Sequence, residues 1–514
     1  MSINVFVYGT LRSGEINDLN HVAARHGLPQ PRALGQGRVP GYLVDFGDWP
    51  GLVPVADGRW VMGDIYQIDP QLLPLLDHIE DVGAPGGSCF MRTEIAVQTT
   101  QGPIRCQYYP VDPAHLQDAP GITDDDWVSY RAARQAAAVD ALETPALLLD
   151  IDRLHANTAM MRARAAALGV TLRPHVKTAK CIEVALAAGD GRTGPITVST
   201  LKEADQFFAA GFTDILYAVG ITPNKLDHVG RLRRAGCDLK IILDNRIAAE
   251  AVCEARSRLG LDLPCLLEID CDGHRSGLKP DDPELLIIAD ILRVGGVTLA
   301  GVLTHAGESY NCRSREAIVA LAEQERAACV HAAQRLRAQG HACPIVSVGS
   351  TPTARYAHKL DGVTELRAGV YMFFDLVMAG IGACTIDEIA LSVLVTVLGH
   401  QPDRGWIITD GGWMAMSRDR GTARQPVDQG YGLVCDRLGR PISGLRMSDA
   451  NQEHGVLSIE QGAVADLVAA YPVGTLLRIL SNHACATGAQ HPRYHLVRQG
   501  GDRIEGIWAR FAGW

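Results

Sequence analysis

The stretch PITVSTLKEADQFFAAGFTDILYAVG (residues 195–220) contains the pattern that decides the fold of most of this chain. It begins with a short apolar segment typical of a buried strand, continues with a helix-forming segment that ends at glycine, and returns to an apolar segment. About eight such strand–helix pairs follow one another over roughly 230 residues, from ALLLDID at 146–152 to IVSVGSTPTA at 345–354. This alternation indicates a parallel sheet and favours a closed (β/α)8 barrel over an open doubly wound sheet.

The regions on either side of the barrel lack this alternation. Residues 1–115 consist of short apolar segments separated by turns rich in glycine and proline, which predict a small β-rich domain. We interpret 116–140 as a linker, 141–385 as the barrel and 386–514 as a C-terminal β domain. The predicted fold is therefore multidomain α/β.

Composition excludes several classes of protein. The formal net charge of −10 argues against a broad nucleic-acid-binding surface. The 13 cysteines are odd in number and include no Cys-x-x-Cys, which argues against a disulfide framework and against a zinc ribbon. The N-terminus does not resemble a signal peptide, and no apolar run reaches the roughly 20 residues that span a membrane. We expect a cytoplasmic protein that acts on small molecules, without nucleic-acid or membrane partners.

Polar residues that could bind a cofactor follow the predicted barrel strands, where the sites of such barrels lie. Lys177 follows TLRPHV, the loop VGSTPT (348–353) follows PIVSV, and LTHAGESY (303–310) places His305 and Tyr310 at another strand end. Taken alone, Lys177 is more often a solvated charge. A lysine together with a loop suited to phosphate, and without a Gly-Lys-Ser/Thr motif, instead indicates a phosphorylated aldehyde cofactor held as a Schiff base.

The segment SNHACATGAQH (481–491) contains a possible metal-binding pair, His483 and Cys485. Side chains two positions apart on an extended segment lie on the same side. An imidazole and a thiolate suit a borderline-soft ion such as Zn²⁺, and two protein ligands leave positions open for water or substrate. An isolated His-x-Cys is nevertheless more often structural.

Seven ordered motifs connect these regions to a known family: RPHVKT (173–178), LTHAGESY, VGSTPT, ELRAGVYMFFD (365–375), TDGGWMAMSRDRG (409–421), NQEHG (451–455) and NHACAT (482–487). Over roughly residues 140–500, the chain resembles the D-serine dehydratase and D-threonine aldolase family. The resemblance implies an alanine-racemase-like barrel with a β domain, pyridoxal 5′-phosphate and a divalent metal. It also implies a head-to-tail homodimer with the site near the interface.

The resemblance also assigns roles to single residues. Lys177 becomes the Schiff-base lysine, and Gly349, Ser350 and Thr351 bind the cofactor phosphate. His483 and Cys485 become the metal pair. The residues implied to contact the cofactor or the substrate are Arg173, His175, Tyr217, His305, Tyr310, Arg367 and Tyr371. Asp410 and Asp419 could support the metal, but we interpret them as turn residues.

Two reactions of a β-hydroxy D-amino acid are compatible with this set. In dehydration, Lys177 removes the α-proton and the β-hydroxyl leaves with help from a Lewis-acid metal. In retro-aldol cleavage the Cα–Cβ bond breaks and gives glycine and an aldehyde. A thiolate ligand such as Cys485 favours zinc and resembles the dehydratase branch, whereas the aldolase branch has a harder carboxylate there. We favour dehydration of D-serine or 3-hydroxy-D-aspartate, with D-threonine-aldolase-type cleavage as the alternative.

The N-terminal region carries a second resemblance, in VFVYGTLRSG (5–14), LLPLLDHIED (72–81) and CFMR (89–92). These motifs resemble the γ-glutamylcyclotransferase-like family, which implies a small mixed β-barrel and release of 5-oxoproline and a free amine. Backbone N–H groups of Tyr8, Gly9, Thr10 and Leu11 would bind a carboxylate or an oxyanion. Glu80 would be the general acid or base, with Asp77 as a less favoured substitute.

The sequence therefore predicts a bifunctional enzyme, and the fusion of the two domains suggests the hypothesis that the product of one feeds the other. Two other readings remain open. A non-catalytic pyridoxal phosphate protein needs the lysine but neither the metal pair nor the β domain. A racemase needs a second acid or base on the opposite face of the substrate, and the sequence offers no residue for that role.

Overall fold

The computed structural model describes residues 2–46, 49–82, 89–112, 115–116, 119–135, 138–459 and 466–514. The chain divides into two compact units, residues 1–136 and 137–514. The division falls inside the stretch interpreted as a linker, and each unit is described by itself. Within the described residues, no helix has the length and apolar character needed to cross a membrane.

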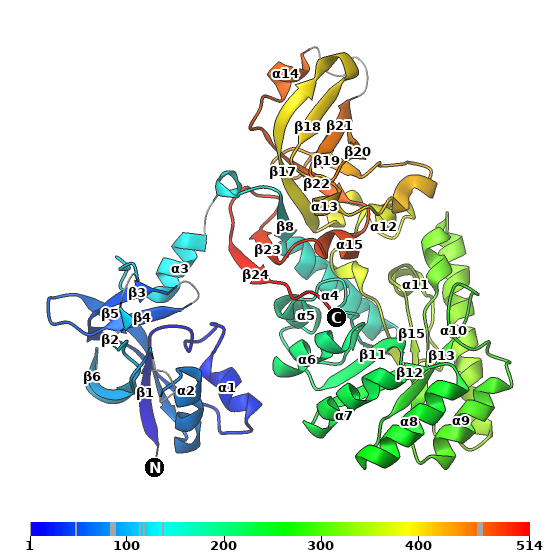
Figure 1. The fold of residues 1–514 in the computed structure, drawn as a ribbon, viewed down its shortest axis with the longest axis horizontal. Coiled ribbons are helices and arrows are strands. Elements are labelled where there is room, and N and C mark those ends of the chain that lie inside the picture. The colour runs from blue at the N-terminus through cyan, green and yellow to red at the C-terminus, as the bar shows by residue number, and fades with distance from the viewer. Residues whose placement is uncertain are drawn as a thin grey trace. The chain divides into compact units, whose positions relative to one another are not determined.

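The smaller unit is built on a closed β-barrel (Figure 1). Around the barrel the strands are ordered β1 (Ile3–Val7), β5 (Trp60–Ile68), β2 (Arg32–Pro40), β6 (Thr93–Thr99) and β7 (Gly102–Tyr108). Antiparallel pairs predominate, but β1 and β7 pair in parallel, so the barrel is mixed. The other elements are α1 (Leu19–Arg25), β3 (Tyr42–Asp45), β4 (Pro50–Val53), α2 (Leu73–Ile79) and α3 (Trp127–Gln135).

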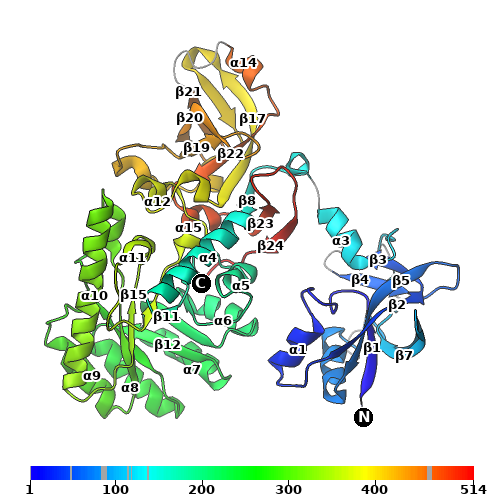
Figure 2. The ribbon, with the colours of Figure 1, turned by 180° about the vertical axis from the view of Figure 1, so that it is seen from behind.

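The larger unit contains an eight-stranded parallel sheet that curls into a barrel surrounded by helices (Figures 1 and 2). A parallel bridge between His175 and Thr197 joins its two edges. In sheet order the strands are β10 (Ile196–Val198), β11 (Asp214–Gly220), β12 (Asp238–Leu243), β13 (Cys265–Ile269), β14 (Leu299–Thr304), β15 (Ile345–Val348), β16 (Glu365–Leu366) and β9 (Thr171–Leu172). The helices are α4 (Ile151–Ala167), α5 (Ile182–Ala188), α6 (Leu201–Ala209), α7 (Leu226–Arg234), α8 (Arg246–Leu259), α9 (Glu284–Val294), α10 (Arg315–Ala338) and α11 (Thr351–Tyr356).

The C-terminal sheet has nine strands and includes one from before the barrel. Its order is β18 (Trp406–Thr409), β21 (Gly455–Ile459), β20 (Pro441–Ala450), β19 (Gly432–Cys435), β22 (Leu476–Ser481), β17 (Leu391–Gln401), β8 (Ala146–Asp150), β23 (Arg493–Val497) and β24 (Gly506–Ala509). Strands β17 and β18 also pair with each other. Short helices α12 (Leu376–Gly380), α13 (Trp413–Met416), α14 (Leu467–Ala470) and α15 (Ala484–Gly488) connect the strands.

The prediction of a multidomain α/β fold with a mixed barrel, a parallel barrel and a C-terminal β domain is confirmed, but one strand was assigned to the wrong sheet. The segment ALLLD, counted as the first barrel strand, is β8 and pairs with β17 and β23 of the C-terminal sheet. The eighth barrel strand is instead the two-residue β16. All five residues of β8 are buried, so the strand has the same continuous apolar pattern as a parallel barrel strand.

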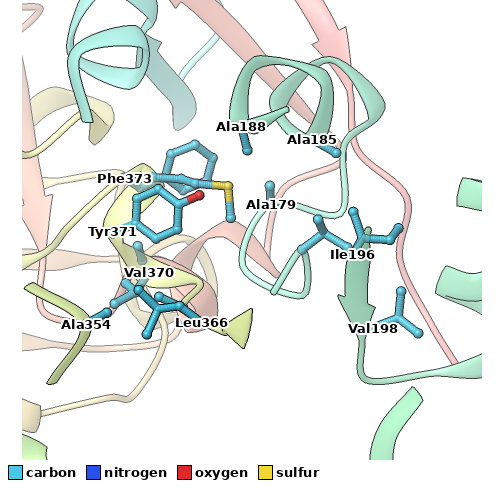
Figure 3. Packing of buried hydrophobic residues seen from close by; sticks show 14 of the residues in the cluster. Ala179, Ala185, Ala188, Ile196, Val198, Ala354, Leu366, Val370, Tyr371 and Phe373 are labelled. Carbon is cyan, nitrogen blue, oxygen red and sulfur yellow. The ribbon is translucent and has the colours of Figure 1, made fainter. Parts of the chain in front are cut away.

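One hydrophobic core runs from the barrel into the C-terminal sheet. Figure 3 shows Ala179, which follows β9, in the same packed cluster as Tyr371 and Phe373. The Phe373 ring packs edge-on against Tyr494 at 5.6 Å, and the Tyr494 hydroxyl donates to the Ala179 carbonyl at 2.7 Å. The loop that carries Lys177 is therefore fixed between the two domains of this unit.

Candidate active site

A cavity of about 660 Å³ lies in the larger unit where the barrel strands end and the C-terminal domain begins. This is the end of a β/α barrel at which functional side chains gather. The residues that the sequence analysis selected and that line this cavity are His175, Lys177, His305, Tyr310, Gly349, Ser350, Thr351, Arg367, His483 and Cys485. Barrel and C-terminal residues thus meet around one space.

Lys177 enters the cavity from the loop after β9. Its neighbours Val176 and Thr178 are fully buried, whereas Lys177 itself is exposed. Packing on both sides fixes the backbone of the loop, and the lysine is the side chain left free to meet a ligand.

The loop after β15 makes a close backbone approach that requires glycine at position 349. Gly349 has φ of 136°, and a Cβ there would lie 2.0 Å from the Arg367 carbonyl oxygen. The next residue, Ser350, caps α11 and its Oγ lies 2.8 Å from Ser309 Oγ. The Thr351 hydroxyl accepts the Tyr371 N–H at 3.2 Å. This loop is held in shape by contacts with three other parts of the site.

Glu325 of α10, which the sequence analysis missed, ties two of the site loops together. Its Oε1 accepts the backbone N–H groups of Ala306 and Gly349, each at 3.0 Å. Burial raises the pKa of this carboxyl, and those hydrogen bonds oppose the shift. A glutamate in the middle of an amphipathic helix reads as a surface residue, so the sequence offered no signal for this contact.

Two cavity imidazoles are held neutral. Burial lowers the pKa of His305 to about 3, and the charge of Lys177 adds to the effect. Burial and Lys177 also lower the pKa of His175 well below its usual range. His305 Nδ1 donates to the Gly349 carbonyl at 3.2 Å, which leaves Nε2 as a hydrogen-bond acceptor.

Three residues predicted to contact the cofactor or the substrate lie outside the cavity lining. Arg173 is buried and pairs with Glu365 and Asp214, each at 2.9 Å. Tyr217 is fully buried, and its hydroxyl accepts the Lys225 ammonium at 2.8 Å. Tyr371 is also fully buried. The structure therefore buries these three side chains away from the cavity.

His483 and Cys485 lie together at the cavity wall, and Asp419 lies behind the imidazole. Asp419 Oδ2 accepts from His483 Nδ1 at 2.7 Å, and Cys485 Sγ lies 3.2 Å from the Thr178 hydroxyl. Burial raises the pKa of Cys485, but His483 and Lys177 outweigh it and leave the pKa below its ordinary value. Asp419 was interpreted as a turn residue; its Oδ1 does accept the Gly421 N–H at 2.8 Å, and its Oδ2 in addition orients His483. Asp410 accepts the Thr396 N–H at 2.8 Å and has a local structural role.

The smaller unit brings Tyr8 and Glu80 close to each other. Burial raises the pKa of Tyr8 strongly, and the Glu80 charge is the next cause. The Tyr8 hydroxyl donates to the Tyr109 carbonyl at 2.5 Å, and the motif continues with Gly9, Thr10 and the buried Leu11. Burial raises the pKa of Glu80 to about 7. Asp77, the less favoured candidate, pairs with Arg92 and accepts the Tyr109 hydroxyl at 2.9 Å.

Three family models match separate parts of the chain. "Gamma-glutamyl cyclotransferase, AIG2-like" matches residues 5–129, "Alanine racemase, N-terminal domain" matches 149–377, and "Putative serine dehydratase domain" matches 390–497. The D-threo-3-hydroxyaspartate dehydratase of Delftia sp. (strain HT23) is 57% identical over 375 residues, which cover 73% of this chain and 98% of that protein. The chain belongs to the D-serine dehydratase and D-threonine aldolase family.

Other relatives support the assignment of the larger unit to this family and the match of the smaller unit to a γ-glutamylcyclotransferase model. A D-serine dehydratase of Dictyostelium discoideum is 30% identical over 70% of this chain and 94% of that protein. Two solved structures of D-threo-3-hydroxyaspartate dehydratase, one from Delftia sp. HT23 and one a cysteine-to-alanine mutant in the metal-free form, are each 56% identical with a TM-score of 0.71. They cover 73% and 74% of this chain and all of their own chains. In the smaller unit, the γ-glutamylaminecyclotransferase of Bos taurus is 32% identical over 20% of this chain and 63% of that protein.

Membership of this family confirms the prediction of a pyridoxal phosphate-dependent lyase. The readings as a non-catalytic cofactor-binding protein and as a racemase are therefore set aside. The γ-glutamylcyclotransferase-like domain predicted for the N-terminal region is also confirmed.

Proposed function

We propose that the larger unit eliminates water from a β-hydroxy D-amino acid, such as D-serine or 3-hydroxy-D-aspartate, and releases a 2-oxo acid and ammonia. The observation that carries this proposal is one cavity lined both by Lys177 and by the pair His483 and Cys485. Elimination needs a base at the α-carbon and assistance for a poor leaving group at the β-carbon. The similarity to D-threo-3-hydroxyaspartate dehydratase supports the same reaction.

The cavity residues fit pyridoxal 5′-phosphate. Lys177 is the exposed amine that would form the Schiff base, and the loop of Gly349, Ser350 and Thr351 would hold the phosphate. The loop depends on glycine at position 349, because a Cβ there would collide with the Arg367 backbone. In addition, His175 has a buried Nδ1 without a hydrogen-bond partner among the described residues, which a bound ligand could supply. When bound, the cofactor withdraws electrons from the α-carbon and makes its proton acidic.

The pair His483 and Cys485 fits a divalent metal, for which we favour zinc. An imidazole whose other nitrogen bonds a carboxylate, here Asp419, is a common arrangement at zinc sites. The described residues contain no group of three or more histidine, cysteine, aspartate or glutamate residues placed to hold an ion. The pair would thus leave coordination positions for water and substrate, and a metal there acts as a Lewis acid toward the leaving hydroxyl.

The other side chains then have defined tasks. Lys177 takes the proton from the α-carbon as the bond between the β-carbon and its hydroxyl breaks. His305 stays neutral, because its pKa is far below physiological pH, and so it adds no second positive charge beside Lys177. Arg367 is buried and donates to Ser347 Oγ at 2.8 Å, which fixes a positive charge under the cavity.

Retro-aldol cleavage is the second candidate, because D-threonine aldolase of Arthrobacter sp. is also a relative, 31% identical over 374 residues. Cys485 argues for dehydration, since a soft thiolate favours zinc over the harder ions that a carboxylate would select. The two reactions differ in their products, which a direct measurement distinguishes.

The first test compares variants of the purified enzyme supplied with pyridoxal phosphate and zinc. We expect Lys177→Ala to lower the rate of 2-oxo acid release from D-serine or 3-hydroxy-D-aspartate by at least about 1,000-fold. Cys485→Ser should lower it by about 10- to 100-fold and weaken zinc binding. The matched controls are Lys202→Ala and Cys312→Ala, which lie outside the cavity lining. Equal losses in variants and controls would contradict the proposed roles.

For the smaller unit we propose γ-glutamyl cyclotransfer, with Glu80 as the acid–base residue. The substrate amine attacks its own γ-carbonyl, the bond to the leaving amine breaks, and 5-oxoproline forms. Glu80 suits proton transfer because its pKa of about 7 lies near physiological pH. Release of 5-oxoproline from a series of γ-glutamyl amines tests this proposal.

We further propose that the chain is bifunctional, homodimeric and cytoplasmic. All 13 cysteines are free thiols, which is consistent with a reducing compartment. If the activities are coupled, the smaller unit should accept a γ-glutamyl derivative of an amino acid that the larger unit consumes, and rejection of every such derivative would overturn the coupling. Light scattering of the purified chain determines whether it is a dimer.

A further inference from the structure

Positive charge at the cavity is not balanced by the carboxylates that line it. Among the described residues, Asp375, Asp419 and Glu268 are the acidic lining residues. Asp419 pairs with His483, Asp375 accepts two backbone N–H groups, and Glu268 faces Arg275 at 4.0 Å. Each carboxylate therefore already has a partner.

Three lining arginines, Arg313, Arg367 and Arg424, form no ion pair with a carboxylate within the described part of the chain. Arg367 is buried and bonds Ser347 Oγ, so Arg313 and Arg424 are the two that are exposed at the cavity. Arg313, just before α10, donates to the carbonyl of Cys312 at 3.1 Å and to that of Arg424 at 3.0 Å. The Arg424 side chain is exposed at the cavity, and no described residue bonds or pairs with it. The hydrogen bond to the Arg424 carbonyl holds the Arg313 guanidinium against the backbone of Arg424, so two positive charges without a carboxylate partner lie on neighbouring segments of the cavity wall. An anion between them would be stabilised.

We propose that Arg313 and Arg424 bind a second carboxylate on the β-carbon of the substrate, so that the enzyme prefers an acidic β-hydroxy D-amino acid such as 3-hydroxy-D-aspartate over D-serine. This inference rests on the proposed function of the larger unit. The 3₁₀ turn Gly421–Arg424 follows directly on Asp419 and Arg420, so one short segment connects the partner of His483 with Arg424. The β-carbon carries both the leaving hydroxyl and the second carboxylate, so a hydroxyl directed to His483 and Cys485 leaves the carboxylate within reach of this segment.

Binding of two unreactive ligands tests the inference without turnover. D-Aspartate and D-alanine both lack a β-hydroxyl, and only D-aspartate has the second carboxylate. We measure their dissociation constants from the absorbance change of the pyridoxal phosphate-loaded enzyme, in wild type and in Arg313→Gln, Arg424→Gln and Arg315→Gln. Arg315 is the matched control, because it carries the same charge two residues from Arg313 but contacts the Tyr356 ring outside the cavity lining.

The wild type should bind D-aspartate about tenfold or more tightly than D-alanine. Arg313→Gln and Arg424→Gln should each reduce this preference about tenfold without changing the affinity for D-alanine, and Arg315→Gln should preserve it. A preference that survives both substitutions, or a wild type without preference, would overturn the inference. Turnover of D-serine by the same proteins tests the proposed function separately, because neither arginine is needed for that substrate.

Discussion

Two carboxylates one helical turn apart in the smaller unit, Asp77 and Glu80, differ in their surroundings. Asp77 is neutralised by Arg92 and accepts the Tyr109 hydroxyl, so it holds structure together. Glu80 is half-buried beside Tyr8, and burial raises its pKa to about 7. Similar side chains in nearly the same position can therefore have different tasks.

The raised pKa of Glu80 predicts the pH dependence of cyclotransfer. If its carboxylate form is the base, kcat/KM should rise about tenfold per pH unit below pH 7 and level off above it. Glu80→Gln should lower kcat/KM by at least about 100-fold, whereas Asp77→Asn should keep the pH profile. A profile without an inflection near pH 7, or an active Glu80→Gln variant, would contradict this role.

At the scale of single residues, the sequence predicted which residues lie near the cavity better than it predicted where their side chains point. Lys177, Gly349 and Cys485 were identifiable because each belongs to a motif at a strand end. Arg173 and Tyr217 also lie at such strands, but both are buried outside the cavity lining, where Arg173 pairs with Glu365 and the Tyr217 hydroxyl accepts from Lys225. The sequence does not reveal the register of a strand, and a shift of one position moves every side chain to the opposite face of the sheet.

Helix α10 carries the buried Glu325, which holds two loops at the cavity wall in place from behind. Glu325→Ala leaves the N–H groups of Ala306 and Gly349 without their acceptor, which should cost about 1–3 kcal/mol of stability and weaken pyridoxal phosphate binding about tenfold. Glu325→Gln keeps an acceptor oxygen and should restore most of the binding. Absorbance titration with the cofactor measures both effects.

The control for this helix is Glu323→Ala, because Glu323 is exposed on α10 and pairs only locally with Arg326. It should leave cofactor binding unchanged. If Glu325→Ala binds the cofactor as wild type does, the two loops hold their shape without this helix.

The error in assigning β8 shows the limit of reading elements from the sequence. A strand buried on both faces has the same apolar pattern in either sheet, and only long-range pairing with β17 and β23 distinguishes them. Strand β16 has two residues and is too short for a periodic pattern. The number of barrel units could thus be predicted, but the identity of the eighth strand could not.

The chain combines two compact units, and each resembles proteins that exist without the other. We therefore expect residues 137–514, produced alone, to fold and to retain the dehydratase rate within about twofold. Residues 1–136 alone should retain cyclotransfer. Circular dichroism and the two activity assays measure this, with the intact chain as the control; loss of either activity in the isolated unit would show that the units depend on each other.

The most direct test of the proposed function identifies the carbon products formed from 3-hydroxy-D-aspartate by the intact chain loaded with pyridoxal phosphate and zinc. Nuclear magnetic resonance of the mixture distinguishes the reactions, because dehydration leaves a four-carbon 2-oxo acid with ammonia and retro-aldol cleavage leaves glycine with a two-carbon aldehyde. We predict the four-carbon 2-oxo acid and one equivalent of ammonia, both lost on chelation and in Lys177→Ala. Glycine in place of ammonia would contradict elimination and assign the cavity to aldol cleavage.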